Sequence, residues 1–319
     1  MLNKKNMNRR KFIKLSAAGA AAAGTAALIL NSGKLFITSN ALENNIPLDA
    51  KKVFWKYGAC SHTFCHLLNH EFGHLKEAEE NASDPLAGGL MNTQNQCGML
   101  WGSTLAVGAE SFRRFNDHNQ ATAMAITATQ HVVESFSRRT KTVNCSDVIG
   151  FDFSEKPKTA KFMLKSIPGG PSNILCMNLA EKWAPEAIQS AKEGLSDKQA
   201  DLPQLPINCA SEVVKNIGAN EEEMVTVAGF AGGMGLSGNA CGALGAAIWK
   251  SSLDWCRKHP GESGYLNPNA NKILKAFYDA TDSEILCPKI SGQRFKTIGD
   301  HTEFIKNSGC DKLLKILAQ

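Results

Sequence analysis

The sequence predicts an all-α protein made of two pseudo-repeated helical lobes with glycine-rich loops. Eight segments place apolar residues three and four positions apart, which is the spacing of an amphipathic helix. No segment alternates apolar and polar residues for long, and valine and isoleucine are sparse, so a large sheet is not expected. The predicted helices cover residues 60–72, 97–114, 120–138, 174–193, 208–217, 241–257, 268–280 and 310–318.

A repeat within the chain predicts the two lobes. Residues 87–106 and 231–250 both carry Ala-Gly-Gly ten residues before a Cys-Gly pair, so Cys97 matches Cys241. Five glycines within residues 229–238 allow left-handed or very close backbone conformations in the second copy.

The repeat continues downstream through two further cysteines in each copy. The residues around Cys145 match those around Cys287 without a gap, and each copy then reaches a Cys-x-x-Leu, at Cys176 and Cys310. The Ala-Gly-Gly element and the three cysteines that follow it occur in the same order in both copies, which indicates an internal duplication.

The first cysteine of each copy is assigned from local sequence. Cys60 and Cys209 each open a helical pattern. Cys65 is a rival, because it lies 32 residues before the next framework cysteine, as Cys209 does. We prefer Cys60, which leaves Cys65 and Cys256 outside the framework. The framework cysteines are then Cys60, Cys97, Cys145, Cys176, Cys209, Cys241, Cys287 and Cys310.

This pattern resembles a known family. The second copy reads Cys209, then Ala240-Cys241-Gly242-Ala243-Leu244-Gly245, then Cys287 and Cys310, which is similar to the redox-active family named for its C_GCAxxG_C_C pattern. The resemblance covers residues 205–319 well and residues 55–180 more loosely, and it implies that the cysteines perform redox chemistry. Ala240 stands where the family name has glycine, and the later glycine is displaced. The framework is also similar to that of split-Soret cytochromes, but the chain has no Cys-x-x-Cys-His, so covalent haem is not expected.

Cys97 and Cys241 are the predicted catalytic thiols. Asn239 is positioned to cap a helix that begins near Cys241, and Cys97 has an equivalent place. The positive end of a helix dipole favours thiolate and lowers the thiol pKa. The alternative is a small buried apolar residue at a tight helix–loop junction.

The cysteines also suggest a cofactor. The chain has no Cys-x-x-Cys, which argues against a thioredoxin-type dithiol, a zinc ribbon or a bacterial ferredoxin run. We expect four cysteines per lobe to hold an iron–sulfur cluster, or else another thiolate-bound metal such as zinc. The second-copy set of Cys209, Cys241, Cys287 and Cys310 is the first choice for metal ligands. The alternatives are a metal-free thiol–disulfide redox protein and a partner-binding protein with structural disulfides.

One histidine motif suggests a different activity. His70-Glu71-Phe72-Gly73-His74 matches the HExxH motif of zinc metalloproteases, and His62 and His66 extend the histidine stripe. The second copy has nothing similar and no third ligand is evident, so we rank this activity last. A solvated or partly buried histidine face is the simpler interpretation. A ligand role for His62 or His66 beside the cysteines is an intermediate one.

The N-terminus resembles a twin-arginine signal. Residues 1–41 contain Arg9-Arg10 in a basic stretch, a mildly apolar alanine-rich segment, and a small-x-small cleavage site at Ser39-Asn40-Ala41. The resemblance implies the twin-arginine translocase as a partner and a periplasmic or extracytoplasmic location. The alternative is an uncleaved membrane anchor.

The remaining sequence divides into a first lobe at residues 42–192, a linker at 193–206 and a second lobe at 207–319. Removing the seven basic charges of residues 1–41 from the formal +5 leaves −2, which gives no reason to expect nucleic-acid binding. The redox partner is not identified by the sequence, which is compatible with a monomer or a homo-oligomer.

Overall fold

The computed structural model describes residues 48–150, 175–198 and 202–319. The predicted signal peptide therefore lies outside the described residues. Within these ranges the protein is all-helical, and the only extended pairing is two isolated β-bridges. This confirms the predicted fold class. No helix of the described ranges is both long and apolar enough to cross a membrane.

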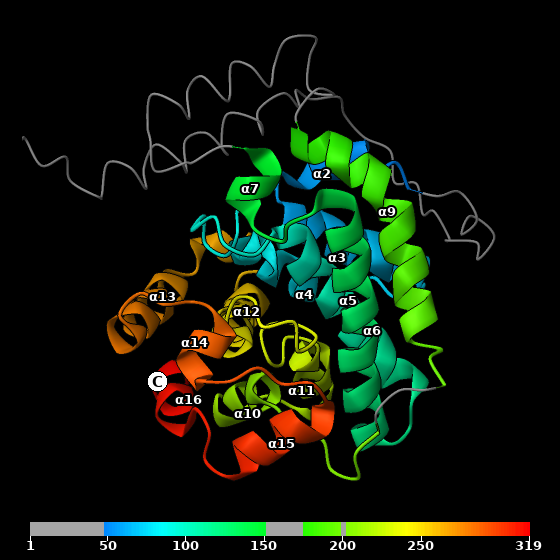
Figure 1. The fold of residues 1–319 in the computed structure, drawn as a ribbon. Coiled ribbons are helices and arrows are strands. Elements are labelled where there is room, and N and C mark those ends of the chain that lie inside the picture. The colour runs from blue at the N-terminus through cyan, green and yellow to red at the C-terminus, as the bar shows by residue number, and fades with distance from the viewer. Residues whose placement is uncertain (1–47, 151–174, 199–201) are drawn as a thin grey trace, which may run out of the picture. The chain divides into compact units, whose positions relative to one another are not determined.

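We call the helices from α2 to α9 the first lobe and those from α10 to α16 the second lobe (Figure 1). The first lobe contains α2 (Ala50–Tyr57), α3 (Cys60–Glu71), α4 (Glu77–Ala82), α5 (Gly98–Arg114), α6 (His118–Thr140), α7 (Cys145–Ile149) and α9 (Leu175–Gly194). The second lobe contains α10 (Cys209–Asn216), α11 (Glu221–Ala228), α12 (Gly242–Lys258), α13 (Pro268–Thr281), α14 (Cys287–Ser291), α15 (Ile298–Lys306) and α16 (Asp311–Leu317).

The helices repeat as the cysteines do. Helices α5 and α12 each have 17 residues, begin immediately after a cysteine and pack against α3 and α10, respectively. Helices α7 and α14 each have five residues, begin at a cysteine and end at a glycine with a left-handed backbone. Helix α9 reaches two residues into the stretch predicted as a linker.

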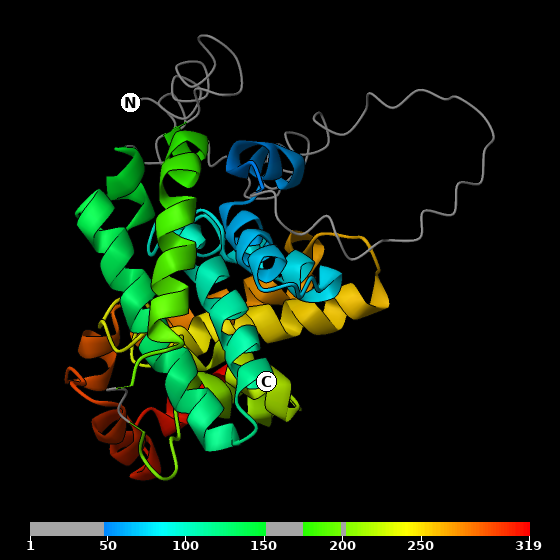
Figure 2. The same cartoon turned by 90° about the vertical axis from the view of Figure 1, so that its right-hand side faces the viewer.

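The two lobes exchange helices across their boundary. Helix α11 of the second lobe packs against α5 of the first, and α4 of the first lobe packs against α12 of the second (Figures 1 and 2). Because α4 and α11 occupy equivalent places in the repeat, this exchange is reciprocal. The described residues accordingly belong to one compact unit.

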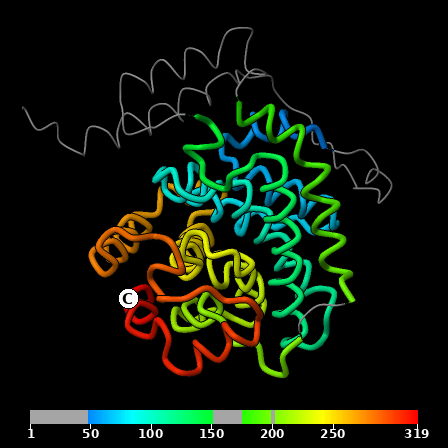
Figure 3. Tube along the Cα trace, in the orientation of Figure 1, coloured from blue at the N-terminus to red at the C-terminus, as the bar shows by residue number. Residues whose placement is uncertain are grey.

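Close contacts lock the boundary. The buried Trp101 ring meets Phe230 edge-on at 4.6 Å, and a Cβ at Gly245 would lie 2.3 Å from the Trp101 ring. The side chain of Gln96 accepts a hydrogen bond from the Ala240 amide at 3.2 Å. The chain trace of Figure 3 shows the two halves side by side, with the red C-terminal helix next to α10, which it contacts.

Candidate functional site

In the second lobe, the four framework cysteines line a single cavity. Cys209, Cys241, Cys287 and Cys310 come from four separate chain segments, together with apolar side chains and His301. The cavity has a volume of about 20 Å³, room for roughly one water molecule. Distant parts of the sequence thus present four soft sulfur donors to one space.

Each cysteine is positioned by the start of a helix. Cys209 and Cys287 are the first residues of α10 and α14, while Cys241 and Cys310 precede α12 and α16. The prediction of a helix beginning near Cys241 is confirmed, although Cys241 itself occupies the cap position. At α10 the amide of Cys209 donates to its own sulfur, and at α12 the amides of Ala243 and Leu244 donate to Cys241, because the first turn of a helix leaves its N–H groups without helical partners.

Short backbone bridges hold the second and third cysteines of each copy together. In the second lobe Ala240 pairs with Leu286, and the amides of Cys241 and Cys287 donate to carbonyls of the opposite strand at 2.8 Å. In the first lobe Gln96 pairs with Asn144 in the same way. The repeat therefore includes the backbone that joins the cysteines.

The glycine-rich loops form the same unusual turn in both lobes. Residues 88–92 and 232–236 are consecutive left-handed residues, a conformation that glycine adopts without strain. The amide of Gly88 donates to the Cys60 sulfur, and that of Gly232 donates to Cys209. The Ala-Gly-Gly element thus presents an amide to the first cysteine of each copy.

The glycine after the second cysteine permits close approach. A Cβ at Gly242 would lie 1.8 Å from the Phe230 carbonyl oxygen, and a Cβ at Gly98 would lie 2.5 Å from the Cys60 sulfur. A side chain at either position would force the long helix away from the other cysteines.

In the first lobe, electrostatic interactions connect Cys60, Cys97, Cys145 and Cys176. The Cys97 thiol donates a hydrogen bond to Cys60, which holds the pKa of Cys60 below its usual range. The same bond, burial and the charges of the other cysteines raise the pKa of Cys97. Cys60 rather than Cys65 therefore belongs to this group. Cys65 lies five residues later on α3, so its side chain points to another face.

The expectation that helix ends lower the pKa of Cys97 and Cys241 is wrong in direction. Burial raises the pKa of Cys241 to about 12, although the amides of Leu244 and Ala243 oppose the rise. Burial also raises the pKa of Cys176 and Cys287 to about 12, aided by charges of neighbouring cysteines. The free-energy cost of burying a thiolate therefore exceeds the stabilisation that the helix-end amides provide.

Four cysteine sulfurs are the donor set of thiolate-bound metals and of iron–sulfur clusters. Four ligands at the zinc–sulfur bond length of 2.3 Å lie about 3.8 Å apart in a tetrahedron. Among the described residues, no three cysteine, histidine or carboxylate side chains gather closely enough to hold one metal ion. In a [4Fe–4S] cluster each of the four cysteines binds a different iron, so the sulfur atoms stand farther apart than around one ion, whereas in a [2Fe–2S] cluster two cysteines share each iron.

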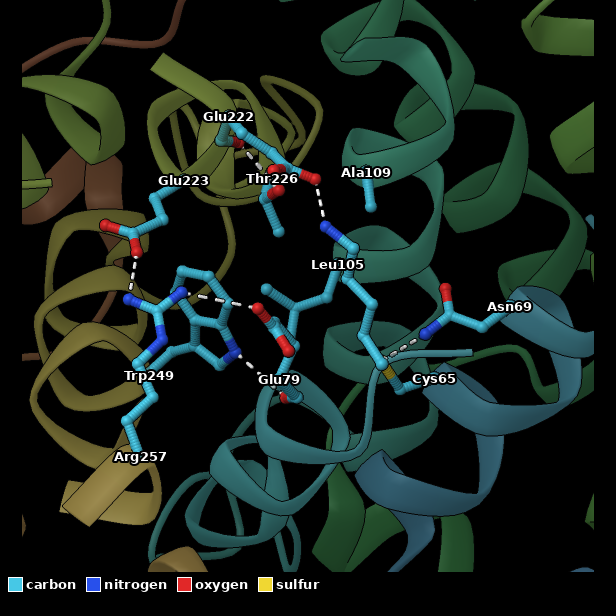
Figure 4. A pocket seen from close by; sticks show the side chains of 11 residues that line it. Cys65, Asn69, Glu79, Leu105, Ala109, Glu222, Glu223, Thr226, Trp249 and Arg257 are labelled. Carbon is cyan, nitrogen blue, oxygen red and sulfur yellow. Dashed lines mark hydrogen bonds and ion pairs between the residues drawn. The ribbon is translucent and has the colours of Figure 1, made fainter. Parts of the chain in front are cut away.

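A second cavity lies between the lobes and contains Cys65. Figure 4 shows its lining, in which Arg257 pairs with Glu223 and with Glu79. Lys76 also lines the cavity and pairs with Glu222. These pairs join α4 to α11 and α12. The cavity measures about 20 Å³. Its charged side chains form ion pairs across the lobe boundary, so they stabilise the packing of the two lobes.

The histidine motif does not form a protease site. Helix α3 ends at Glu71, and a left-handed Gly73 separates His70 from His74. The pair therefore does not share one helix face, and Glu71 is ion-paired with Lys192. The zinc-protease interpretation is wrong for this reason.

His62 and His66 do not join the cysteines either. The Nδ1 atom of His62 lies 3.0 Å from Asp84, and that of His66 lies 2.8 Å from Glu80. Both histidines therefore have carboxylate partners within a buried polar network.

A known protein family matches both parts of the chain that carry the cysteine frameworks. A model described as "Putative redox-active protein (C_GCAxxG_C_C)" matches residues 58–187 and 207–319. The chain belongs to this family. Its two matched segments are the two cysteine frameworks described above, so the C_GCAxxG_C_C unit occurs twice in this chain. No curated protein and no solved structure matches it.

Sequence reasoning missed two residues near the cysteines. His301 lines the second-lobe cavity, and the phenol of Tyr265, from the second lobe, interacts with Cys60 and Cys145 of the first. His301 could have been found from the sequence, because it lies between the third and fourth cysteines of the second copy. Nothing in the sequence indicated that Tyr265 reaches across to the other lobe.

Proposed function

We propose that this C_GCAxxG_C_C protein is an electron-transfer protein that holds one iron–sulfur cluster on the four cysteines of each lobe. The observation that carries the proposal is the convergence of four cysteines from four segments on one cavity in the second lobe. The sequence repeat and the shared bridges extend the proposal to Cys60, Cys97, Cys145 and Cys176. A bound cluster would supply one-electron redox chemistry.

The chain's own groups suit this role. Burial and mutual repulsion keep most of the free thiols protonated, so thiolates are stabilised only when a positive metal group is present. The amides of Gly88 and Gly232 donate to cysteine sulfurs, and such bonds favour the thiolate. The mostly apolar lining leaves room for roughly one water molecule at the site.

The N-terminal sequence supports a cellular location. A twin-arginine signal at residues 1–41 would export the chain already folded, with its metal inserted beforehand. We propose a periplasmic or extracytoplasmic protein that exchanges electrons with a partner there.

The decisive experiment uses the chain purified without oxygen from the host that makes it. Iron and acid-labile sulfide are quantified per chain, and the electron paramagnetic resonance spectrum is recorded after reduction. Iron and sulfide in similar amounts with a cluster signal support the proposal. Zinc alone, or no metal with disulfides among the framework cysteines, contradicts it.

One observation favours a second function, metal-free thiol–disulfide exchange in the first lobe. The Cys97 thiol donates to Cys60 and favours its thiolate. In this scheme the Cys60 thiolate attacks a disulfide of a partner protein and releases one partner thiolate. Cys97, as thiolate, then attacks the mixed disulfide and releases the second. The partner gains two electrons and two protons, and a Cys60–Cys97 disulfide remains. Mass mapping of the oxidised chain would detect that bond.

A further inference from the structure

Within the described part of the chain, His301 is a buried polar residue with an unsatisfied ring nitrogen. It lies on α15 with 2% of its surface exposed, and its Nδ1 atom has no hydrogen-bond partner among the described residues. Its ring meets Phe295 edge-on at 4.7 Å. A buried polar atom without a partner destabilises the fold, so its presence needs a reason.

The position of His301 supplies that reason. It lines the same cavity as Cys209, Cys241, Cys287 and Cys310. The ring therefore shares a cavity with the four cysteine side chains. An imidazole ring carries at least one N–H donor whether it is neutral or protonated.

The two copies differ at this place. The sequence between Cys287 and Cys310 contains His301, whereas that between Cys145 and Cys176 contains no histidine. The second-lobe site also has a neighbouring cation, since the Arg294 guanidinium donates to the Ser237 carbonyl of the glycine-rich loop at 3.4 Å. Hydrogen-bond donors and positive charge near a cluster favour its more negative, reduced form.

We propose that His301 is a fifth residue of the second-lobe site, where its ring N–H donates to the sulfur-bound group and raises its reduction potential above that of the first-lobe group. This inference rests on the proposed iron–sulfur function. It makes the two sites unequal, with Cys209, Cys241, Cys287 and Cys310 as ligands and His301 as a tuning residue.

The test compares the loaded full chain with His301→Phe, which removes the donor, and His301→Gln, which retains one. His118→Phe is the matched control, because His118 also has a buried Nδ1 atom without a described partner but does not line this cavity. The readouts are iron and sulfide per chain, circular dichroism, and a potentiometric titration followed by absorbance.

We expect His301→Phe to keep its iron and to lower one of two midpoint potentials. A change of about tenfold in the redox equilibrium constant corresponds to 59 mV for one electron. His301→Gln should recover part of the shift, and His118→Phe should show none.

Three results would overturn the inference. The first is a loaded His301→Phe chain that titrates like wild type. The second is loss of half the iron in both His301 variants, which would make His301 a ligand or a folding determinant. The third is a wild-type chain without iron and sulfide, which overturns the proposed function as well.

Discussion

Replacing Gly242 by alanine tests how the Cys-Gly pair builds the second-lobe site. The new Cβ would lie 1.8 Å from the Phe230 carbonyl oxygen, whereas ordinary contacts begin at 3.4 Å. The start of α12 or the glycine-rich turn must therefore move by about 1.6 Å, the difference between these distances. Overpacking against rigid backbone costs up to about 3 kcal/mol of unfolding free energy.

The same movement displaces Cys241, the adjacent residue, from the other three cysteines. We therefore expect Gly242→Ala to lose iron from the second lobe as well as stability. Gly299→Ala is the matched control, because its Cβ would lie 3.6 Å from the Thr297 hydroxyl oxygen, an ordinary contact distance. This substitution lies within α15 and should stabilise the chain by up to about 1 kcal/mol.

Guanidinium unfolding of the reduced, metal-free chains measures the first effect, and anaerobic iron analysis measures the second. A Gly242→Ala chain with full iron content and an unfolding free energy within about 0.5 kcal/mol of wild type would refute this reasoning.

Three further predictions concern buried ionisable groups. In the reduced, metal-free chain, iodoacetamide should modify Cys60 before Cys97, because the hydrogen bond from Cys97 lowers the pKa of Cys60; equal rates by mass spectrometry would contradict this. Glu223→Ala should lower the free energy of unfolding in guanidinium by about 3 kcal/mol, because it leaves the buried ammonium of Lys250 without this carboxylate. A decrease under about 1 kcal/mol would show that the ion pair contributes little. The pKa of His301 is lowered from 6.5 to about 4, so the metal-free fold should lose up to about 3 kcal/mol as pH falls from 6.5 to 4. His301→Phe should remove that part of the pH dependence. If the unfolding free energy of the variant differs between pH 7 and pH 4.5 by as much as that of wild type, His301 is not the cause.

The helical class and the long helices were predictable because apolar spacing and the cysteine repeat agree. Among the described helices of six or more residues, the prediction missed α2, α4, α11 and α15. Helices α11 and α15 each begin with a capping box, at Asn220 and Thr297, that local sequence could have revealed. Both are short and lie next to glycine-rich or polar turns, where periodicity is weak.

The exchange of α4 and α11 between lobes was not predictable from one sequence. It depends on long-range packing, such as the approach of Gly108 to the Thr226 carbonyl, where a Cβ would lie 2.2 Å from the oxygen. The direction of the cysteine pKa shifts also depends on burial, which the sequence does not give. Local helix-end chemistry alone therefore predicted the wrong sign for Cys97 and Cys241.

The central claim is that each lobe holds its own cluster on four cysteines. Its most direct test compares iron and sulfide per chain in wild type, Cys97→Ser, Cys241→Ser and the double variant, all purified without oxygen. Two separate sites predict that each single variant keeps about half the wild-type iron. The double variant should then keep almost none. Unchanged iron in the double variant, or no iron in wild type, would contradict the account.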